Sequence, residues 1–302
     1  MGKRKHSGLT YGRRISREIV RHPANEGRRM RALARGWGWQ VRKRVLRRPV
    51  DVAYEGYVLR CHPDSQSASN VWYFTARYDH DEMDFLDRYL RPGDRVIDIG
   101  ANIGTYVLFA ARRIGPDGRI TELEPEPRNA TRLQENIDLN ALGSLVEVHA
   151  VAVASETGEV EFTLDHDVSN AIVLTGAARG TRTVVPAVRL DEVVEAHERL
   201  AVAKMDVEGA EAMAMRGAEA LLAERLPPVW ITEILENQLQ KLGSSAAEVQ
   251  KLFLRHGFKP FTWSAAAAEL RPTSGDLRGN VVFVASEQLA QVQDRLADAD
   301  LP

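Results

Sequence analysis

Short apolar runs alternate with amphipathic stretches through the middle of the chain, which is the pattern of repeated strand–helix units. Because a connection between parallel strands has to cross the sheet, such units predict an α/β fold with a mostly parallel sheet and helices on both faces. The apolar runs that predict strands are Arg95–Ile99, Arg119–Leu123, Val146–Val151, Ala201–Met205 and Val229–Ile234.

The stretches that follow these strands have helical spacing and predict helices over Ile103–Arg113, Pro127–Leu142, Gly209–Leu222 and Ala246–His256. Two further strand-like runs, Lys259–Trp263 and Asn280–Val284, are expected to pair as a terminal hairpin. The five parallel strands and this pair together predict a seven-stranded sheet.

The pattern differs before and within these units. Val50–Arg60 and Val71–Tyr78 are rich in valine, tyrosine and tryptophan, which predicts short strands, and Asp79–Leu90 has the spacing of a helix. Residues 158–188 mix strand-like and loop-like sequence between the third and fourth strands. Near the N-terminus, residues 27–47 predict a helix with arginines between its apolar positions, whereas residues 1–25 predict little ordered structure.

Charge changes this picture only at the N-terminal segment. Residues 1–48 carry 16 lysines or arginines and two acids, a balance of +14, and the other residues carry 24 bases and 40 acids, a balance of −16. A basic arm on an acidic domain is compatible with contact to nucleic acid or to a membrane surface, and also with an arm that folds back or stays solvated. Because basic runs alone are not specific, the last arrangement is our default, and nucleic acid is not an expected partner.

Other compositional features restrict the class of protein. The hydrophobic fraction of 44% supports a folded globular core. The sequence has no run of eighteen apolar residues and no secretory signal, so we expect a cytoplasmic protein without a membrane span. The single cysteine, Cys61, excludes an internal disulfide and is expected to pack in the core. Whether the chain forms a homo-oligomer is left open.

The first strand–helix junction has the form of a ligand-binding turn. Val96–Tyr106 reads V-I-D-I-G-A-N-I-G-T-Y, and glycines let a backbone turn tightly and approach a ligand closely. The spacing of Gly100 and Gly104 lacks the middle glycine that makes room for a pyrophosphate in dinucleotide-binding turns. S-adenosylmethionine has no phosphates and needs a polar rim, which Asp98 and Asn102 are predicted to supply.

The second junction adds an acid at the expected position. Glu124 follows the second strand, about twenty residues beyond the glycine turn, where a carboxylate can accept hydrogen bonds from ribose hydroxyls. A nucleoside cofactor is therefore predicted at these two strand ends.

Candidate reactive groups follow the fourth and fifth strands: Lys204, Asp206, Glu208 and Glu233. In one interpretation Asp206 or Glu208 is the general base for a substrate hydroxyl and Lys204 tunes its pKa. In a second, Asp206, Glu208 and Glu233 bind a divalent cation such as Mg²⁺. In a third, Glu208 caps a helix and Lys204 forms a structural salt bridge. The sequence does not separate these alternatives.

Together these motifs resemble the FkbM-type methyltransferases. The resemblance runs from about Arg91 to Ile234 and implies a Rossmann-like class I methyltransferase fold, preceded here by the basic helical segment. It also implies an S-adenosylmethionine-dependent enzyme that O-methylates a hydroxyl of a sugar or a small-molecule natural product. One departure is Thr121-Glu122-Leu123, where the family more often has a small or aromatic residue before Glu-Pro. The matching motifs are V-I-D-I-G-A-N-I-G (96–104), E-P-E-P (124–127), L-x-x-N-x-x-x-N (133–140) and K-M-D-V-E-G-A-E (204–211).

Two rival functions stay open beside this one. An RNA methyltransferase could use the basic arm to hold phosphates, but residues 204–209 lack the Asn/Asp-Pro-Pro-aromatic turn of amino-directed base methyltransferases. A non-catalytic cofactor-binding module is the other rival. We divide the chain into a basic, partly helical arm (1–48), strands and a helix that cover part of the acceptor site (49–90), and the S-adenosylmethionine-binding domain (91–302).

Overall fold

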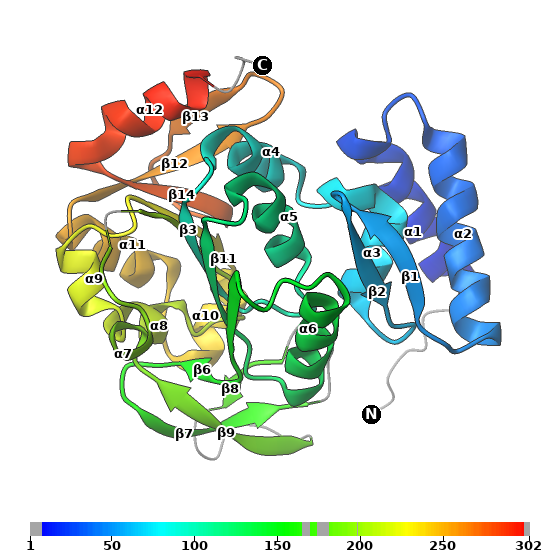
Figure 1. The fold of residues 1–302 in the computed structure, drawn as a ribbon, viewed down its shortest axis with the longest axis horizontal. Helices are drawn as coiled ribbons and strands as arrows, with labels where there is room; N and C mark the ends of the chain where they lie inside the picture. Colours follow the sequence, from blue (N-terminus) through cyan, green and yellow to red (C-terminus); the bar gives the residue numbers. More distant parts are fainter. Residues whose placement is uncertain (1–7, 165–169, 174–180, 198, 299–302) are drawn as a thin grey trace.

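The main sheet of the protein has eight strands within the part of the chain that the structure describes. A computed structural model describes all residues except 1–7, 165–169, 174–180, 198 and 299–302. The strand order is β13-β12-β14-β11-β10-β3-β4-β5, parallel from β11 to β5 and antiparallel at the β14, β12 and β13 side (Figure 1). Its strands are β3 (Arg95–Ile99), β4 (Arg119–Leu123), β5 (Val146–His149), β10 (Leu200–Met205), β11 (Val229–Ile234), β12 (Phe258–Ser264), β13 (Glu269–Pro272) and β14 (Gly279–Ala285).

Helices cover both faces of this sheet because its strands are apolar on both sides. On β3, Val96 belongs to the core under one helical layer and Ile97 to the core under the other. The first layer consists of α4 (His80–Tyr89), α5 (Thr105–Ile114), α6 (Pro127–Leu139) and α12 (Leu289–Ala297). The second consists of α7 (Leu190–Val193), α8 (Glu211–Arg216), α9 (Glu219–Ala223) and α11 (Ala246–Arg255), and the short α10 (Glu236–Leu239) follows β11. The predicted Rossmann-like α/β class is confirmed.

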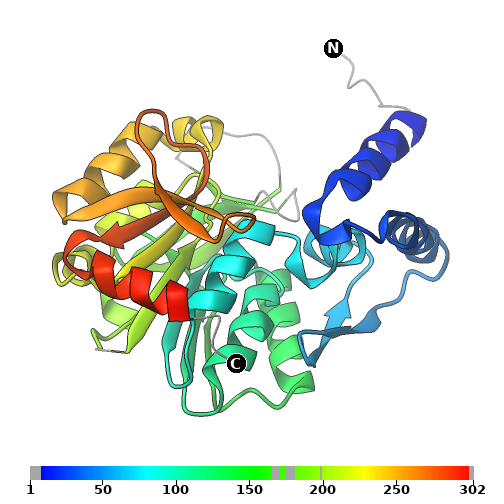
Figure 2. The same cartoon turned by 90° about the horizontal axis from the view of Figure 1, so that it is seen from above.

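Two smaller units flank the main sheet. Four strands among the described residues between 152 and 188 form a second sheet of order β6-β9-β7-β8 beside the carboxyl ends of the parallel strands. The N-terminal elements form a lobe on the side of α5 and α6 that faces away from the main sheet, as Figures 1 and 2 show. The elements of these units are β6 (Ala152–Val153), β7 (Gly158–Thr163), β8 (Ile172–Val173), β9 (Arg182–Val188), α1 (Gly8–Arg21), α2 (Arg29–Val45), α3 (Gln66–Phe74), β1 (Val50–Tyr54) and β2 (Tyr57–Cys61).

Two asparagines attach this lobe to the main domain: Asn136 in α6 and Asn140, which caps the C-terminus of that helix. Asn140 accepts from Val58 N and donates to Val58 O, at 2.8 and 2.7 Å. Asn136 accepts from Arg60 N at 2.7 Å and donates to Ile103 O, in the first strand–helix turn, at 2.8 Å. The L-x-x-N-x-x-x-N motif therefore docks β2 through its backbone, and Asn136 contacts lobe and turn at once.

The prediction of a strand over Val71–Tyr78 is wrong, because this segment ends helix α3 and continues as a short 3-10 turn. Ser65 caps the helix by accepting from Ala68 N at 3.2 Å. Trp72 stacks on Trp39 of α2 with ring centroids 5.0 Å apart. Packing against α2 thus overrides the strand propensity of the aromatic run.

The prediction of little order over residues 1–25 is wrong for the part described, because residues 8–21 form α1. Ile15 and Ile19 are buried, and the buried Asn25 donates to Ile19 O and Tyr73 O at 2.9 and 2.8 Å. Arginines between these apolar positions concealed an amphipathic helix that is stabilised by α2 and α3.

Two other predictions need smaller corrections. The single helix predicted over Gly209–Leu222 is two helices, α8 and α9. They are separated at Gly217, where a Cβ would lie 2.1 Å from Ala154 O. The terminal strands pair as predicted, but β13 adds an eighth strand outside β12, which the seven-strand prediction missed. No helix among the described residues is long and apolar enough to cross a bilayer.

Replacing Phe253 by alanine should lower the free energy of unfolding by about 3–5 kcal/mol, measured by urea denaturation. Its ring is fully buried and stacks on Phe283 with centroids 3.9 Å apart. Leu254 on the same helix is 48% exposed, so Leu254→Ala should change stability by less than about 0.5 kcal/mol. Equal losses in the two variants would contradict this account of the core.

Candidate functional site

The turn from β3 into α5 approaches β10 so closely that only glycine fits. A Cβ at Gly100 would lie 2.0 Å from Asp206 O, and Gly100 has φ 91°. Asn102 and Gly104 follow with φ 52° and 85°, and a Cβ at Gly104 would lie 2.7 Å from a Leu133 methyl group. Left-handed backbone of this kind favours glycine and tolerates asparagine. The sequence therefore folds this turn directly against the end of β10.

Glu124 is fixed beside this turn by backbone hydrogen bonds. Its two carboxylate oxygens accept from Asn102 N and Glu126 N, both at 2.8 Å. Burial raises the pKa of Glu124 to about 7, against these backbone donors. Each carboxylate oxygen has a second lone pair, so Glu124 can still accept from a ligand hydroxyl.

Asp98 and Lys204 form a buried ion pair behind the turn. Lys204 Nζ lies 3.7 Å from Asp98 Oδ1 and 3.5 Å from Asp206 Oδ2, and it lies over the Tyr106 ring, 4.6 Å from the centroid. Burial alone lowers the pKa of Lys204, but the negative charges of Asp98 and Asp206 outweigh it, so the pKa is raised. Lys204 is therefore a permanent cation between the turn and β10.

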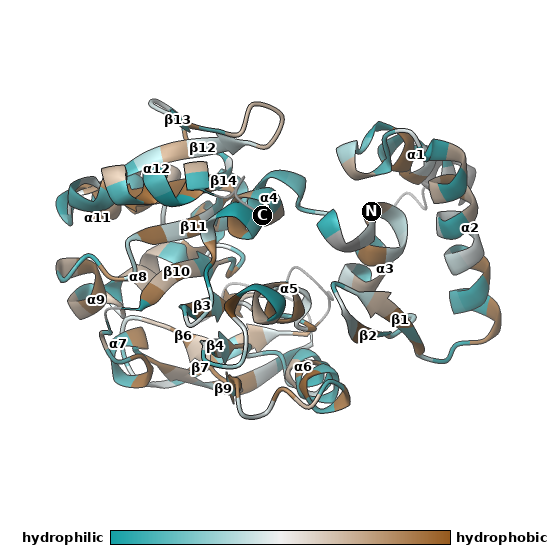
Figure 3. Cartoon of the chain, turned by 45° about the horizontal axis from the view of Figure 1, so that its top comes forward, coloured by the Kyte–Doolittle hydropathy of each residue, from teal (hydrophilic) through white to brown (hydrophobic). Residues whose placement is uncertain are grey.

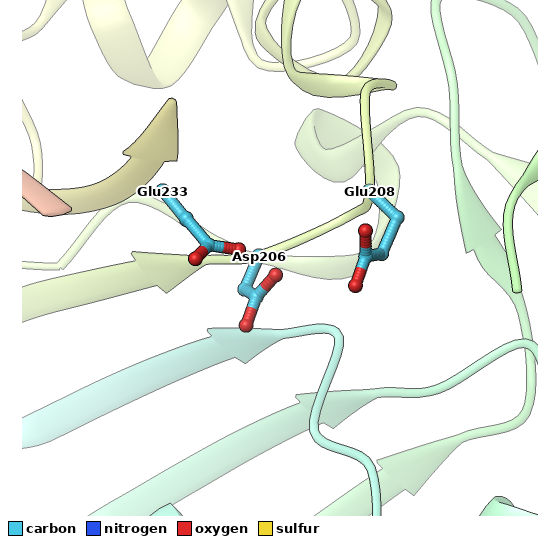
Figure 4. Close-up of side chains that lie close together, drawn as sticks. All are labelled: Asp206, Glu208 and Glu233. Carbon is cyan, nitrogen blue, oxygen red and sulfur yellow. The ribbon is translucent and has the colours of Figure 1, made fainter. Parts of the chain in front are cut away.

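Three carboxylates meet at the ends of β10 and β11 (Figure 4). Asp206, Glu208 and Glu233 each place an oxygen within 4.8 Å of the others. Burial, together with the charge of Asp206, raises the pKa of Glu208 to about 7 and that of Glu233 to about 8. Glu208 and Glu233 therefore exchange protons near neutral pH.

The backbone after β10 is held in an uncommon conformation. Glu208 has φ 53° and Gly209 has φ 106°, and a Cβ at Gly209 would lie 2.5 Å from Gln238 O. Glu208 Oε2 accepts from Gln238 Nε2 at 2.8 Å, and Glu211 accepts from Gly209 N at 3.1 Å. In the D-V-E-G-A-E block, the geometry of this turn therefore requires Gly209 and is stabilised by Glu211.

The turn and the acids share one cavity of about 200 Å³. It is lined by all the predicted site residues except Asp98 and Gly104: Gly100, Asn102, Glu124, Lys204, Asp206, Glu208 and Glu233. Asp98 was predicted in the polar rim, but the structure places it behind the cavity wall, 2% exposed and paired with Lys204. Gly104 instead packs on Leu133.

The lobe and the second sheet complete the cavity. Ser67 and Asn70 of α3 and the following Tyr78 and Asp79 form one wall, in line with the predicted cover by residues 49–90, although the domain boundaries stay a prediction. Apolar side chains on the other side include Phe162 and Ile172.

Sequence reasoning missed Asp79 and Tyr106 as parts of the site. Tyr106 Oη donates to Asp79 Oδ2 at 2.8 Å, and burial raises the pKa of Asp79. In the sequence, Asp79 is an aspartate before a predicted helix, which is typical of an N-cap, and Tyr106 occupies a helix position that is typical of packing.

The donor set fits a nucleoside with a cationic end. Glu124 has free lone pairs for ribose hydroxyls, the apolar wall suits a base, and the Asp206 carboxylate supplies negative charge. No phosphate-binding nest is needed for such a ligand.

The fold and cavity together define the class: this is the Rossmann-like fold of the class I methyltransferases that use S-adenosylmethionine. The chain belongs to the FkbM methyltransferase family, because residues 98–260, more than half of its length, match the methyltransferase FkbM domain. The resemblance seen in the sequence motifs is confirmed.

More distant likenesses cover shorter parts. A stretch of 50 residues is 42% identical to ribosomal RNA large subunit methyltransferase E of Sorangium cellulosum (strain So ce56), covering 17% of this chain and 24% of that protein. A stretch of 69 residues is 39% identical to carboxy-S-adenosyl-L-methionine synthase of Shewanella sp. (strain ANA-3), covering 22% and 28%. The match thus spans about a quarter of the length of these curated relatives.

Solved structures are similar to the chain only at low identity. A SAM-dependent O-methyltransferase from Thermotoga maritima is 16% identical with a TM-score of 0.37, covering 68% of this chain and 64% of that chain. Fibrillarin from Aeropyrum pernix with bound S-adenosyl-L-methionine is 16% identical with a TM-score of 0.37, covering 65% and 68%. The strand order, rather than these distant likenesses, defines the fold class.

The affinity for S-adenosylhomocysteine should fall about tenfold between pH 8 and pH 6, measured by calorimetry. Ribose hydroxyls donate to the ionised carboxylate, and the pKa of Glu124 is raised to about 7, so protonation below that pH removes the acceptor. Glu124→Gln should bind more weakly and lose most of this pH dependence. An unchanged pH profile in this variant would remove Glu124 from ribose recognition.

Proposed function

We propose that the protein is an S-adenosylmethionine-dependent O-methyltransferase that acts on a hydroxyl of a sugar or small-molecule natural product. One observation supports this most directly: the cavity joins the glycine turn and Glu124 to the three-carboxylate cluster. A cofactor cradle and a proton acceptor are the two parts that methyl transfer to a hydroxyl requires.

The reaction assigns different tasks to these parts. When bound, S-adenosylmethionine supplies an electrophilic methyl group on a positively charged sulfur. The acceptor oxygen gains the methyl group and loses its proton, which Asp206, Glu208 or Glu233 accepts. Lys204 holds Asp206 in place through their 3.5 Å contact.

The sequence after the fourth strand favours a hydroxyl acceptor over a nucleobase. Residues 204–209 read K-M-D-V-E-G and contain no Asn/Asp-Pro-Pro-aromatic turn. The names of the relatives keep RNA as the alternative acceptor. A non-catalytic binding module would leave the clustered acids without a task.

Changing Asp206 to asparagine should reduce turnover by at least about a hundredfold, while S-adenosylhomocysteine still binds. The variant keeps the backbone carbonyl that contacts Gly100 and removes only the negative charge at the centre of the cluster. Turnover would be measured by transfer of a labelled methyl group to a panel of sugars, hydroxylated natural products and RNA.

The matched control is Asp117→Asn, the same chemical change at an exposed turn residue, which should keep full activity. Undiminished turnover in Asp206→Asn would contradict its catalytic role. Labelling of RNA alone would replace the hydroxyl metabolite as acceptor, and failure to bind S-adenosylhomocysteine would favour the binding module or another ligand.

A divalent cation is the second candidate role for the same acids. It is favoured by the 4.8 Å grouping of three carboxylate oxygens, which suits the oxygen ligands of Mg²⁺. With a carboxylate as proton acceptor, we expect enzyme treated with EDTA to keep its turnover. Loss of turnover that Mg²⁺ restores, and that Glu233→Gln reproduces, would assign the cluster to a cation.

A further inference from the structure

The outward face of α2 carries a stripe of large apolar side chains. Met30, Trp37, Val41 and Val45, here called the α2 stripe, are 78%, 49%, 59% and 70% exposed. Their spacing of seven, four and four residues puts them on one side of a helix. Large apolar side chains that are exposed along one helix face favour an interaction site.

The stripe is held outward by the packing of the opposite face. Ala32, Gly36 and Trp39 are buried against α1 and α3. Trp39 stacks on Trp72 and donates from Nε1 to Ser69 Oγ at 3.0 Å. Rotating α2 to hide the stripe would break these contacts. Figure 3 shows hydrophobic and hydrophilic residues alternating along α2 at the edge of the lobe.

Basic residues border the stripe on both sides. Arg31 and Arg42 flank one edge and Arg44 the other, and all three are exposed. Helix α2 contains no acidic residue, and residues 1–48 carry a balance of +14. An apolar stripe between arginines is complementary to a surface that is apolar below and anionic above.

We propose that the α2 stripe docks this protein on the surface of an anionic lipid bilayer. The helix has 17 residues, about 25 Å, and would lie in the plane of the headgroups with the stripe in the acyl boundary. It lies on the membrane rather than across it, since α2 is too polar to span.

Other occupants match the stripe less well. Nucleic acid would pair with the arginines but leave Met30, Val41 and Val45 in contact with phosphates or water. A second copy paired through α2 would bring two segments of +14 together, which repel each other. A bilayer with anionic headgroups satisfies both the charge and the apolar side chains.

Docking would bring the reaction cavity close to the bilayer. Helix α3 contacts α2 through Ser69 and Trp72, while Ser67 and Asn70 of the same helix line the cavity. Only helix α3 therefore lies between α2 and the cavity along this path.

The test is co-flotation of the full chain with vesicles of phosphatidylcholine, with or without about one-third phosphatidylglycerol. The wild type should float with the anionic vesicles and not with the neutral ones. The double variant Val41→Ser, Val45→Ser should bind at least about tenfold more weakly. Leu254→Ser on α11, at a residue that is also 48% exposed, should bind like the wild type.

Absence of binding to anionic vesicles, or equal binding by the double variant, would overturn the proposal. A dimer seen by sedimentation that the double variant abolishes, without vesicle binding, would assign the stripe to a second copy. Binding of an RNA oligonucleotide in physiological salt without vesicle binding would assign the basic segment to nucleic acid. Binding of S-adenosylhomocysteine is measured in parallel and shows that each variant is folded.

Discussion

The site depends on how closely the end of β3 approaches the end of β10. These strands are parallel neighbours, with Asp98 opposite Lys204 in the register, so the turn after one must pass the turn after the other. The Asp206 carbonyl occupies the space that a side chain at position 100 would need. This contact places the glycine turn against the three-carboxylate cluster. The other walls of the cavity surround these two parts.

Charge in this region is balanced within the sheet. Lys204, Asp98 and Glu122 lie side by side on three neighbouring strands. Burial and the charge of Asp98 raise the pKa of Glu122 well above its usual value. Lys204 offsets the charge of Asp98 within the sheet, and the carboxyl groups of Asp206, Glu208 and Glu233 line the cavity. The departure from the family pattern at Thr121-Glu122-Leu123 thus includes a buried acid with a raised pKa beside this ion pair.

The parts of this structure that follow from local sequence were predictable, and those that depend on packing were not. Apolar runs predict the parallel strands, glycines predict the turn at Gly100, and the spacing from that turn predicts the role of Glu124. Val71–Tyr78 has strand propensity, but the stacking of Trp72 on Trp39 stabilises a helical conformation instead. Asp79 joins the site through the Tyr106 hydroxyl, a contact between segments 27 residues apart that no spacing rule supplies. The position of Asp98 behind the wall likewise depends on Lys204 from another strand.

The two docking asparagines have a consequence for how the lobe can change. Asn136 and Asn140 bind only the main chain of β2, at Val58 and Arg60, so these three hydrogen bonds do not depend on the side chains of the hairpin. The hairpin side chains add separate contacts, because Glu55 pairs with Arg113 of α5 and Leu59 is buried. The exposed side chain of Val58 can therefore be replaced without loss of these main-chain hydrogen bonds. Because Asn136 also donates to Ile103 O, β2 would keep the same position relative to the glycine turn in such a variant. The exposed face of β2 can thus vary in sequence while its backbone keeps one position relative to the cavity.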